Sequence, residues 1–274
     1  MVAGQLLISL LYAWFSITGI LLATAGDLVL AALHATILIA LLYIAKHPEP
    51  SASQLTVLAP LMIITGYNSL DPAAKTLHTA TFDPLIQEIN HLVFNHSFWT
   101  TAYQTTPTIL GELLVFAYLS YYLLLAVALM KAYTDQKTLF ILLTALFSCY
   151  TLFILFPVGG PLRQTTLHDT GMFSSILKSL YQPTLSDGVF TAAFPSSHVA
   201  IAVVITRLLG HRLWQTLLLG SLTALIAIAT IYTQTHYAID ALLGIPTGIL
   251  LYEAWANIYD YYDDTAAIRE TTRS

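Results

Sequence analysis

Eight apolar segments, separated by short polar stretches, constrain this chain more than any other feature of its sequence. They cover residues 5–25, 28–45, 55–68, 108–130, 138–157, 196–210, 214–234 and 236–258. A membrane-spanning helix needs about 20 apolar residues, with a range of about 17 to 25. Only 9% of the residues are charged and the mean hydropathy is +0.72, so the chain has too few polar side chains to coat a soluble core. We expect an all-α, polytopic membrane helical bundle with about 6–8 transmembrane helices.

The expected organisation has three parts. Residues 1–50 form an N-terminal transmembrane hairpin, residues 51–258 a membrane-embedded domain, and residues 259–274 a polar cytoplasmic tail that frays. Residues 23–25 (Ala-Thr-Ala) are typical of a signal-peptide cleavage site, but no positive charge precedes the first apolar run. Whether the first span is removed therefore stays open.

The distribution of lysine and arginine predicts the orientation, because these residues are enriched in cytoplasmic loops. With the N-terminus inside, seven of the ten basic residues fall on the cytoplasmic side and three on the other: Lys75, Arg163 and Lys178. The long loops 69–107 and 158–194 then face the periplasm, the cell exterior or a lumen. Within the first loop, the apolar spacing of residues 84–99 favours a helix lying on the membrane surface.

Charge and cysteine content exclude other classes of protein. The net charge is -5 and no cluster of lysine and arginine is available to bind phosphates of nucleic acid, so we expect no nucleic-acid partner. The single cysteine, Cys149, rules out an intramolecular disulfide and makes a cysteine-based metal site improbable.

Polar residues of three separate segments fall on the same predicted side of the membrane, the outer one. Ionisable side chains at membrane depth are costly and are functional candidates for that reason. The first group follows the fifth span, the second opens the sixth and the third opens the eighth. In that order, the groups are Arg163; Ser196, Ser197 and His198; and His236 and Asp240.

Each group suits phosphoryl transfer. The N-terminus of a helix offers unpaired N–H groups and partial positive charge to an anion, and Ser196 and Ser197 add hydroxyls there. Pro195 is expected to fix the entry to the helix, and its missing N–H would have had no helical partner. His236 and Asp240 are four residues apart and so share one helix face. Asp240 can then accept the proton of one ring nitrogen and leave the other as a nucleophile or base.

The remaining two side chains complete that chemistry. His198 can protonate a departing alcohol, and Arg163 can hold phosphate oxygens with two hydrogen bonds.

Each group also has a plain structural explanation. Two serines at a helix start are usually a cap. A His-x-x-x-Asp pair is often a polar contact between helices or half of a metal site, and an interfacial arginine often extends toward water. The occurrence of all three groups on one side is what favours a catalytic site.

The motifs of this site resemble the type 2 phosphatidic acid phosphatase superfamily. Residues 195–198 match its second motif, Pro-Ser-x-His, and His236 with Asp240 match the His-x-x-x-Asp that ends its third motif. The resemblance implies a metal-independent membrane enzyme with a six-helix core and no cofactor. It also implies that His236 is the phosphorylated nucleophile, Asp240 its orienting carboxylate, His198 the general acid, and Ser197, with Ser196 close by, the phosphate ligand.

Two expected positive charges are missing. The first motif of the family carries a lysine seven residues before its arginine, where this chain has Phe156, and the third motif carries an arginine six residues before its histidine, where this chain has Thr230. The substitutes that we considered are Gln234, Thr235, Tyr232 and Lys178. Residues 156–161, 192–200 and 232–237, together with Ala-Tyr-Leu-Ser-Tyr-Tyr at 117–122, look more like the inositol-phosphorylceramide-synthase (inositolphosphotransferase-like) branch.

Three functions remain open at this stage. The leading one is hydrolysis of a lipid phosphate that enters from the bilayer, through a phosphohistidine. The second is transfer of a phosphate-containing head group to an alcohol, which requires a second polar pocket, with loop 69–107 as its expected source. The third is a non-catalytic membrane protein that binds lipid phosphates. An intramembrane proton relay in a transporter is a remote fourth, and neither the particular lipid nor the oligomeric state can be inferred.

Overall fold

The structure is a computed structural model, and it describes residues 12–13, 28–46, 52–94, 105–164, 171–186 and 191–271. Its elements are almost entirely helical. In chain order they are α2 (Leu28–Lys46), α3 (Ala52–Asn68), α4 (Leu70–Leu77), α5 (Asp83–Val93), α7 (Thr108–Ala132), α8 (Gln136–Leu155), the 3-10 helix η2 (Pro161–Gln164), α9 (Met172–Ser186), α10 (Ser197–Leu209), α11 (Leu213–Tyr232) and α12 (Ala238–Thr271). Within the described residues the only extended pairing is a bridge between Val158 and Ala192. The all-α fold class predicted from the sequence is confirmed.

Four helices among the described residues are long and apolar enough to cross a membrane: α7, α8, α11 and the first 27 residues of α12. Two shorter apolar helices accompany them, Leu28–Ile44 and α10. With 13 residues, α10 is about 20 Å long, which is less than the hydrocarbon core of about 30 Å. The expected first span, residues 5–25, lies outside the described residues except for Tyr12 and Ala13.

Helix α8 is the centre of the bundle. Every residue from Thr138 to Phe147 is buried, which is the pattern of a helix surrounded by protein on all sides. By contrast, α7, α11 and α12 expose large apolar side chains on one face, including Leu123, Leu217 and Leu250. Such faces fit contact with lipid.

Polar side chains join the N-terminal helices to the bundle. The Tyr12 hydroxyl is 3.0 Å from His34 Nδ1 and 2.8 Å from Thr65 Oγ1. His34 Nε2 is 2.7 Å from Ser69 Oγ. His34 is therefore a buried residue whose two ring nitrogens both have hydrogen-bond partners.

The C-terminal part of α12 differs from the expected fraying tail, because the helix continues to Thr271. Side-chain contacts with α8 hold the part of α12 around residues 259–260. Lys137 Nζ lies 2.7 Å from Asp260 Oδ1, and the rings of Phe140 and Tyr259 are 5.4 Å apart.

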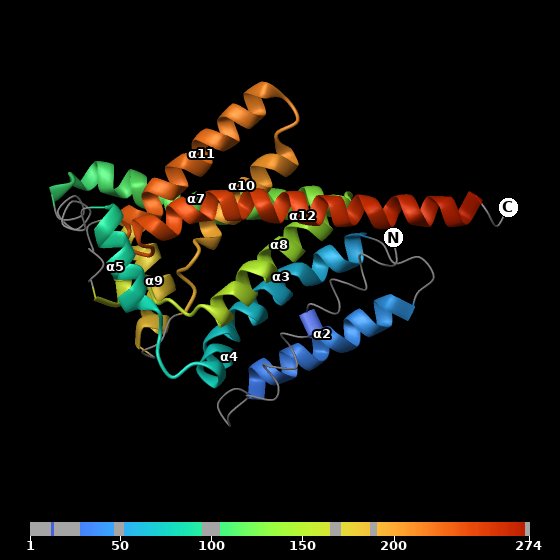
Figure 1. Cartoon of the computed structure of the whole chain (residues 1–274), viewed down its shortest axis with the longest axis horizontal. Helices are drawn as coiled ribbons and strands as arrows, with labels where there is room; N and C mark the ends of the chain where they lie inside the picture. The colour runs from blue at the N-terminus through green and yellow to red at the C-terminus, as the bar shows by residue number, and fades with distance from the viewer. Residues whose placement is uncertain are drawn as a thin grey trace.

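The opposite end of the bundle gathers the segments that carry the candidate site. Figure 1 shows α5 and α9 beside the start of α12, away from the C-terminus. The surface helix expected over residues 84–99 appears as α5, which exposes Leu85, Leu92 and Val93 and buries Ile86. Residues 95–104, which include the end of the expected helix, lie outside the described part of the chain.

Candidate active site

The three predicted groups lie on segments that contact one another through backbone hydrogen bonds. The chain after α8 runs beside the chain before α10, where the Ala193 amide donates to the Val158 carbonyl at 2.9 Å. The Ser196 amide donates to the carbonyl of Asp240 at 3.1 Å. These contacts fix the start of α10 against the start of α12.

A tight turn after α11 presents His236. Gln234 adopts a left-handed backbone conformation with φ of 60°, and the Thr230 carbonyl accepts both the His236 amide, at 3.2 Å, and the Thr235 hydroxyl, at 3.0 Å. Because α11 ends with its last carbonyls satisfied in this way, the turn is compact and His236 points back into the protein, where it is 3% exposed.

The orientation of the His236 ring is set by a backbone carbonyl. Its Nδ1 lies 2.8 Å from the oxygen of Ala193, and its Nε2 lies 3.4 Å from Nδ1 of His198. A carbonyl oxygen can only accept a hydrogen bond, so Nδ1 carries the proton and the lone pair of neutral His236 lies on Nε2. This is the arrangement that a nucleophilic histidine requires.

Asp240 does not make the hydrogen bond that the sequence predicts. His236 precedes α12 by two residues, so the two side chains do not share a helix face, and their closest approach is 3.8 Å, from Nδ1 to Oδ2. Oδ2 instead accepts the Tyr237 amide at 2.8 Å, which caps the start of α12. Oδ1 has no hydrogen-bond partner and the side chain is fully buried, so Asp240 places its carboxyl group close to the imidazole without a hydrogen bond that would orient the ring.

The two serines have different positions at the start of α10. Ser196 is the N-cap: it is fully buried and its hydroxyl accepts the Val199 amide at 3.5 Å. Ser197 is the first helical residue and is half-buried. Pro195 precedes the cap and so lies at the entry to the helix. Of the two hydroxyls, only that of Ser197 is left uncommitted to the cap.

His198 lies between His236 and three tyrosines of α7. Its Nε2 is 3.0 Å from the hydroxyl of Tyr118, and its ring centre is 4.8, 4.5 and 6.0 Å from those of Tyr118, Tyr121 and Tyr122. These tyrosines occupy positions i, i+3 and i+4 and so share one face of α7. Tyr181 of α9 forms a further hydrogen bond with Tyr118.

Arg163 lies in η2, three residues after Gly160, and its side chain is outside the described part of the structure. Gly160 has φ of 80°, and a Cβ at this position would lie 2.8 Å from the carbonyl oxygen of Thr235. The backbone that leads to Arg163 therefore packs directly against the residue before His236.

None of the substitutes considered for the two missing positive charges is shown to act as one. The side-chain amide of Gln234 donates to the Ile231 carbonyl at 3.0 Å, and the Thr235 hydroxyl donates to the Thr230 carbonyl in the same turn. Tyr232 is largely buried beside α7, and Lys178 is half-buried on α9. Thr230 itself is fully buried and Phe156 is 47% exposed, and neither carries a charge that could replace the missing one.

Asp83 and Asn90 of α5 hold the site together and were missed in the sequence. The Asp83 carboxylate accepts the amides of Gly159 and Gly160 at 2.8 and 3.0 Å and the hydroxyl of Tyr237 at 3.3 Å. Asn90 Oδ1 accepts the amide of Ile239 at 3.2 Å. The Asp-Pro pair at 83–84 signals the start of a helix, but nothing in the sequence indicates partners 76 to 154 residues away.

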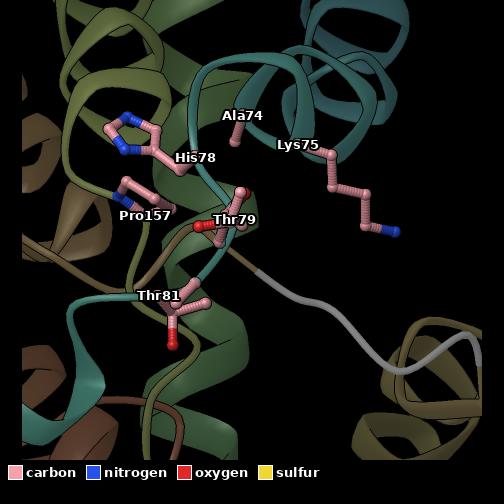
Figure 2. A pocket seen from close by; sticks show the side chains of 8 residues that line it. Ala74, Lys75, His78, Thr79, Thr81 and Pro157 are labelled. Atoms are coloured by element: carbon pink, nitrogen blue, oxygen red, sulfur yellow. The ribbon is translucent and has the colours of Figure 1, made fainter.

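A separate polar pocket of about 210 Å³ opens beside these loops. Figure 2 shows Thr79 and Thr81 along the connection from α4 to α5, with Lys75 on one side and His78 and Pro157 on the other. Thr191, which also lines the pocket, precedes by two residues the carbonyl that orients His236. Most of the residues that line the pocket belong to the loop in which a second polar pocket was expected.

Among the described side chains, no group of three or more His, Cys, Asp or Glu residues has the arrangement of a metal site. The fold and the site together define a multi-pass, all-α membrane protein with two facing histidines at the starts of two helices. A family model confirms the corresponding class: residues 85–254 match that of the PAP2 superfamily, so the chain belongs to this superfamily. Neither a curated protein nor a solved structure gives a significant match.

Proposed function

We propose that this protein is a membrane enzyme that cleaves a lipid phosphoester through a phosphohistidine on His236, with hydrolysis as its main reaction. The observation that supports this proposal is the pair of hydrogen bonds at His236. Nδ1 is held by Ala193 at 2.8 Å, and the lone pair on Nε2 faces His198, which is able to act as an acid. Membership of a superfamily of phosphatases and related phosphotransferases agrees with it.

The reaction has two balanced halves. In the first, Nε2 of His236 forms a bond to phosphorus, the bond from phosphorus to the lipid oxygen breaks, and His198 gives its Nδ1 proton to that oxygen. In the second, Nδ1 of His198 takes a proton from water while the water oxygen attacks phosphorus, and the bond from phosphorus to His236 breaks. At 3.4 Å the two nitrogens leave no room for a phosphoryl group between them, so we expect substrate entry to separate them.

The surrounding groups match the charges that develop. The buried carboxylate of Asp240, 3.8 Å from Nδ1, stabilises positive charge on His236. The Ser197 hydroxyl, the unpaired amides at the start of α10 and the guanidinium of Arg163 are the proposed ligands of the phosphate oxygens. No step requires a metal or another cofactor.

The length of α10 and the distribution of basic residues support a lipid substrate and a site on one side of the membrane. Because α10 is short, its N-terminus lies below the headgroup level if its other end reaches the opposite surface, and a lipid can enter sideways from the bilayer. The excess of lysine and arginine at the other end of the helices supports a site on the outer face.

Transfer to an alcohol is the second candidate, because of the pocket beside Thr191. A pocket with Lys75, His78 and threonine hydroxyls offers polar contacts to a hydroxylated acceptor, which a simple hydrolase does not need. The motif similarity to the inositolphosphotransferase-like branch favours the same candidate.

Phosphate release tests the proposal. Purified protein in detergent, with chelator present, is given a panel of lipid phosphates with and without polar alcohols. We expect release that persists in chelator and disappears in His236→Ala. His211→Ala, an exposed histidine at the opposite end of the bundle, is the matched control and should retain activity.

Three outcomes separate the alternatives. Formation of a phosphorylated alcohol would assign the protein as a transferase. Complete loss of activity in chelator would overturn the metal-independent mechanism. Lipid binding without turnover, unchanged in His236→Ala, would leave a lipid-binding protein.

A further inference from the structure

A continuous line of hydrogen-bonding groups runs from α9 through α7 to the histidine pair. Tyr181 bonds to Tyr118, Tyr118 lies 3.0 Å from Nε2 of His198, and Nδ1 of His198 lies 3.4 Å from Nε2 of His236. The line ends at the Ala193 carbonyl, 2.8 Å from His236.

That carbonyl fixes the direction of every bond in the resting line. His236 must donate from Nδ1, so its Nε2 accepts, and His198 must carry its proton on Nδ1 to donate there. Nε2 of neutral His198 then accepts from the Tyr118 hydroxyl, and the Tyr118 oxygen accepts from Tyr181. Without this constraint, the hydrogen bond between the Tyr118 hydroxyl and His198 could run in either direction.

Catalysis needs the opposite arrangement at Nε2. When a phosphoryl group separates the two histidines, His198 takes up a second proton from solvent at Nε2 and acts as acid and base through Nδ1, so the proton that it retains lies on Nε2. Tyr118 must then accept from Nε2–H and donate to Tyr181. A hydroxyl can make both bonds by rotating, whereas a carboxylate could only accept and an amide nitrogen could only donate.

We propose that Tyr118 is a positioning residue for His198, whose hydroxyl reverses its hydrogen bond during the reaction and keeps Nδ1 directed at His236 and the phosphoryl group. Tyr181 is the second partner that this reversal requires. The inference rests on the proposed function and adds two residues to it. Tyr118 is fully buried and on this account need not contact substrate.

The ionisable groups that face His198 come from three segments. They are Tyr118, Tyr121 and Tyr122 of α7, with Tyr181 of α9 behind Tyr118, and His236 before α12, with Asp240 beside it. Of these, Tyr118 and His236 are the two that hydrogen-bond to the ring. Removal of the Tyr118 hydroxyl therefore takes away the hydrogen-bond partner of His198 Nε2 and keeps His236 as the partner of His198 Nδ1.

Steady-state kinetics of Tyr118→Phe on a short-chain phosphatidic acid in detergent micelles test this role. We expect kcat to fall about tenfold with KM within twofold of wild type. Hydrogen bonds to charged groups are stronger than those between neutral groups, so loss of the acceptor disfavours charged His198. The apparent pKa of the His198-dependent limb of the kcat profile should move down by about half to one unit.

Two comparisons distinguish positioning of His198 by Tyr118 from a general structural effect of the Tyr118→Phe substitution. Tyr150→Phe loses a buried hydroxyl that donates to the carbonyl of Ile63 at 3.1 Å, and it should leave the pH profile unchanged. In a double mutant with His198→Gln, Tyr118→Phe should cause no further loss, since its effect passes through His198. Additive losses, or a wild-type pH profile in Tyr118→Phe, would overturn the inference.

A measurement without turnover keeps this result distinct from the proposed function. In protein labelled with ¹³C-histidine in micelles, the His198 signal is identified by its loss in His198→Gln. We expect its titration midpoint to be lower in Tyr118→Phe than in wild type. An unchanged midpoint rejects the role of Tyr118 even if no substrate is turned over, and absent turnover with a lowered midpoint rejects only the enzymatic proposal.

Discussion

The carboxylate of Asp83 fixes the loop that packs behind His236. Asp83 accepts two consecutive amides, those of Gly159 and Gly160, and thereby neutralises a pair of N–H groups that could otherwise bind an anion. The loop is therefore a structural support for Thr235 and His236, and the proposed function locates phosphate binding elsewhere, at the start of α10.

Asp83→Asn should destabilise the protein and reduce activity. The amide can replace only one of the two acceptor oxygens, and its NH₂ group faces a backbone donor, so we expect a cost of about 1–3 kcal/mol in the free energy of unfolding. Thermal unfolding in detergent and phosphate release would measure both effects. Glu88→Gln, an exposed position on the same helix, is the control; equal behaviour of the two variants would contradict the role of Asp83.

At the scale of elements, close contact between α10 and α12 sets the distance between the two histidines. A Cβ on Gly244 would lie 2.8 Å from the Ser196 oxygen, and one on Gly248 would lie 2.4 Å from the Ala200 oxygen. Two glycines four residues apart on one face allow this approach, as in other membrane helix pairs.

Gly248→Ala should push α10 away from α12. We expect a loss of about 1–3 kcal/mol in stability, together with reduced phosphate release because His198 moves with α10. Gly220→Ala is the matched control, since no atom lies within 4 Å of its added Cβ, and it should be neutral or slightly stabilising. The contrast between the two unfolding midpoints is the measurement, and equal midpoints would refute the packing argument.

The N-cap of α8 gives a prediction about pH. Asp135 accepts the amides of Lys137 and Thr138 at 3.1 and 3.2 Å. Burial raises the pKa of Asp135, but the hydrogen bonds of Thr138 and the ammonium of Lys131 outweigh it and hold that pKa below its usual value. This stabilisation is present above the ordinary aspartate pKa of about 4 and is lost as the pH falls through the lower folded value.

Asp135→Ala should therefore cost about 1 kcal/mol at pH 7 and less near pH 2. Asp135→Asn keeps a capping oxygen without the titration, and its difference from Asp135→Ala should not change with pH over this range. Unfolding midpoints of the three proteins at both pH values test the argument, which fails if Asp135→Ala costs as much at pH 2 as at pH 7.

At the scale of the whole molecule, the two ends of the bundle differ in chemistry. Ion pairs of Lys137 with Asp260 and of Arg207 with Glu253 lie at the end where α12 leaves the bundle. The histidine pair and the polar pocket lie at the other end. From the positive-inside tendency we expect the histidines on the outer side.

Labelling of introduced cysteines tests this orientation. Thr79→Cys, at the pocket, should react with a membrane-impermeant maleimide in intact cells, and His211→Cys should react only after permeabilisation. Cys149 is fully buried, so the background should be low. The reverse pattern of labelling would invert the topology and move the proposed site to the cytoplasm.

The sequence alone determined the fold class, the approximate spans and the choice of His198, His236 and Asp240 as candidates. These features depend on local information: the length of apolar runs, and polar groups that are costly where they occur. The ends of α7, α8 and α11 fall within a few residues of their expected positions for the same reason.

The tertiary structure decided the partners of those residues. Ala193 rather than Asp240 orients His236, Ser196 is used as a cap, and Tyr118 meets His198 across 80 residues. Asp83 reaches Gly159 across 76 residues. Such contacts depend on how α5 and α10 pack against α12 and how α7 packs against α10, and no local pattern in the chain specifies which distant donor will meet which acceptor.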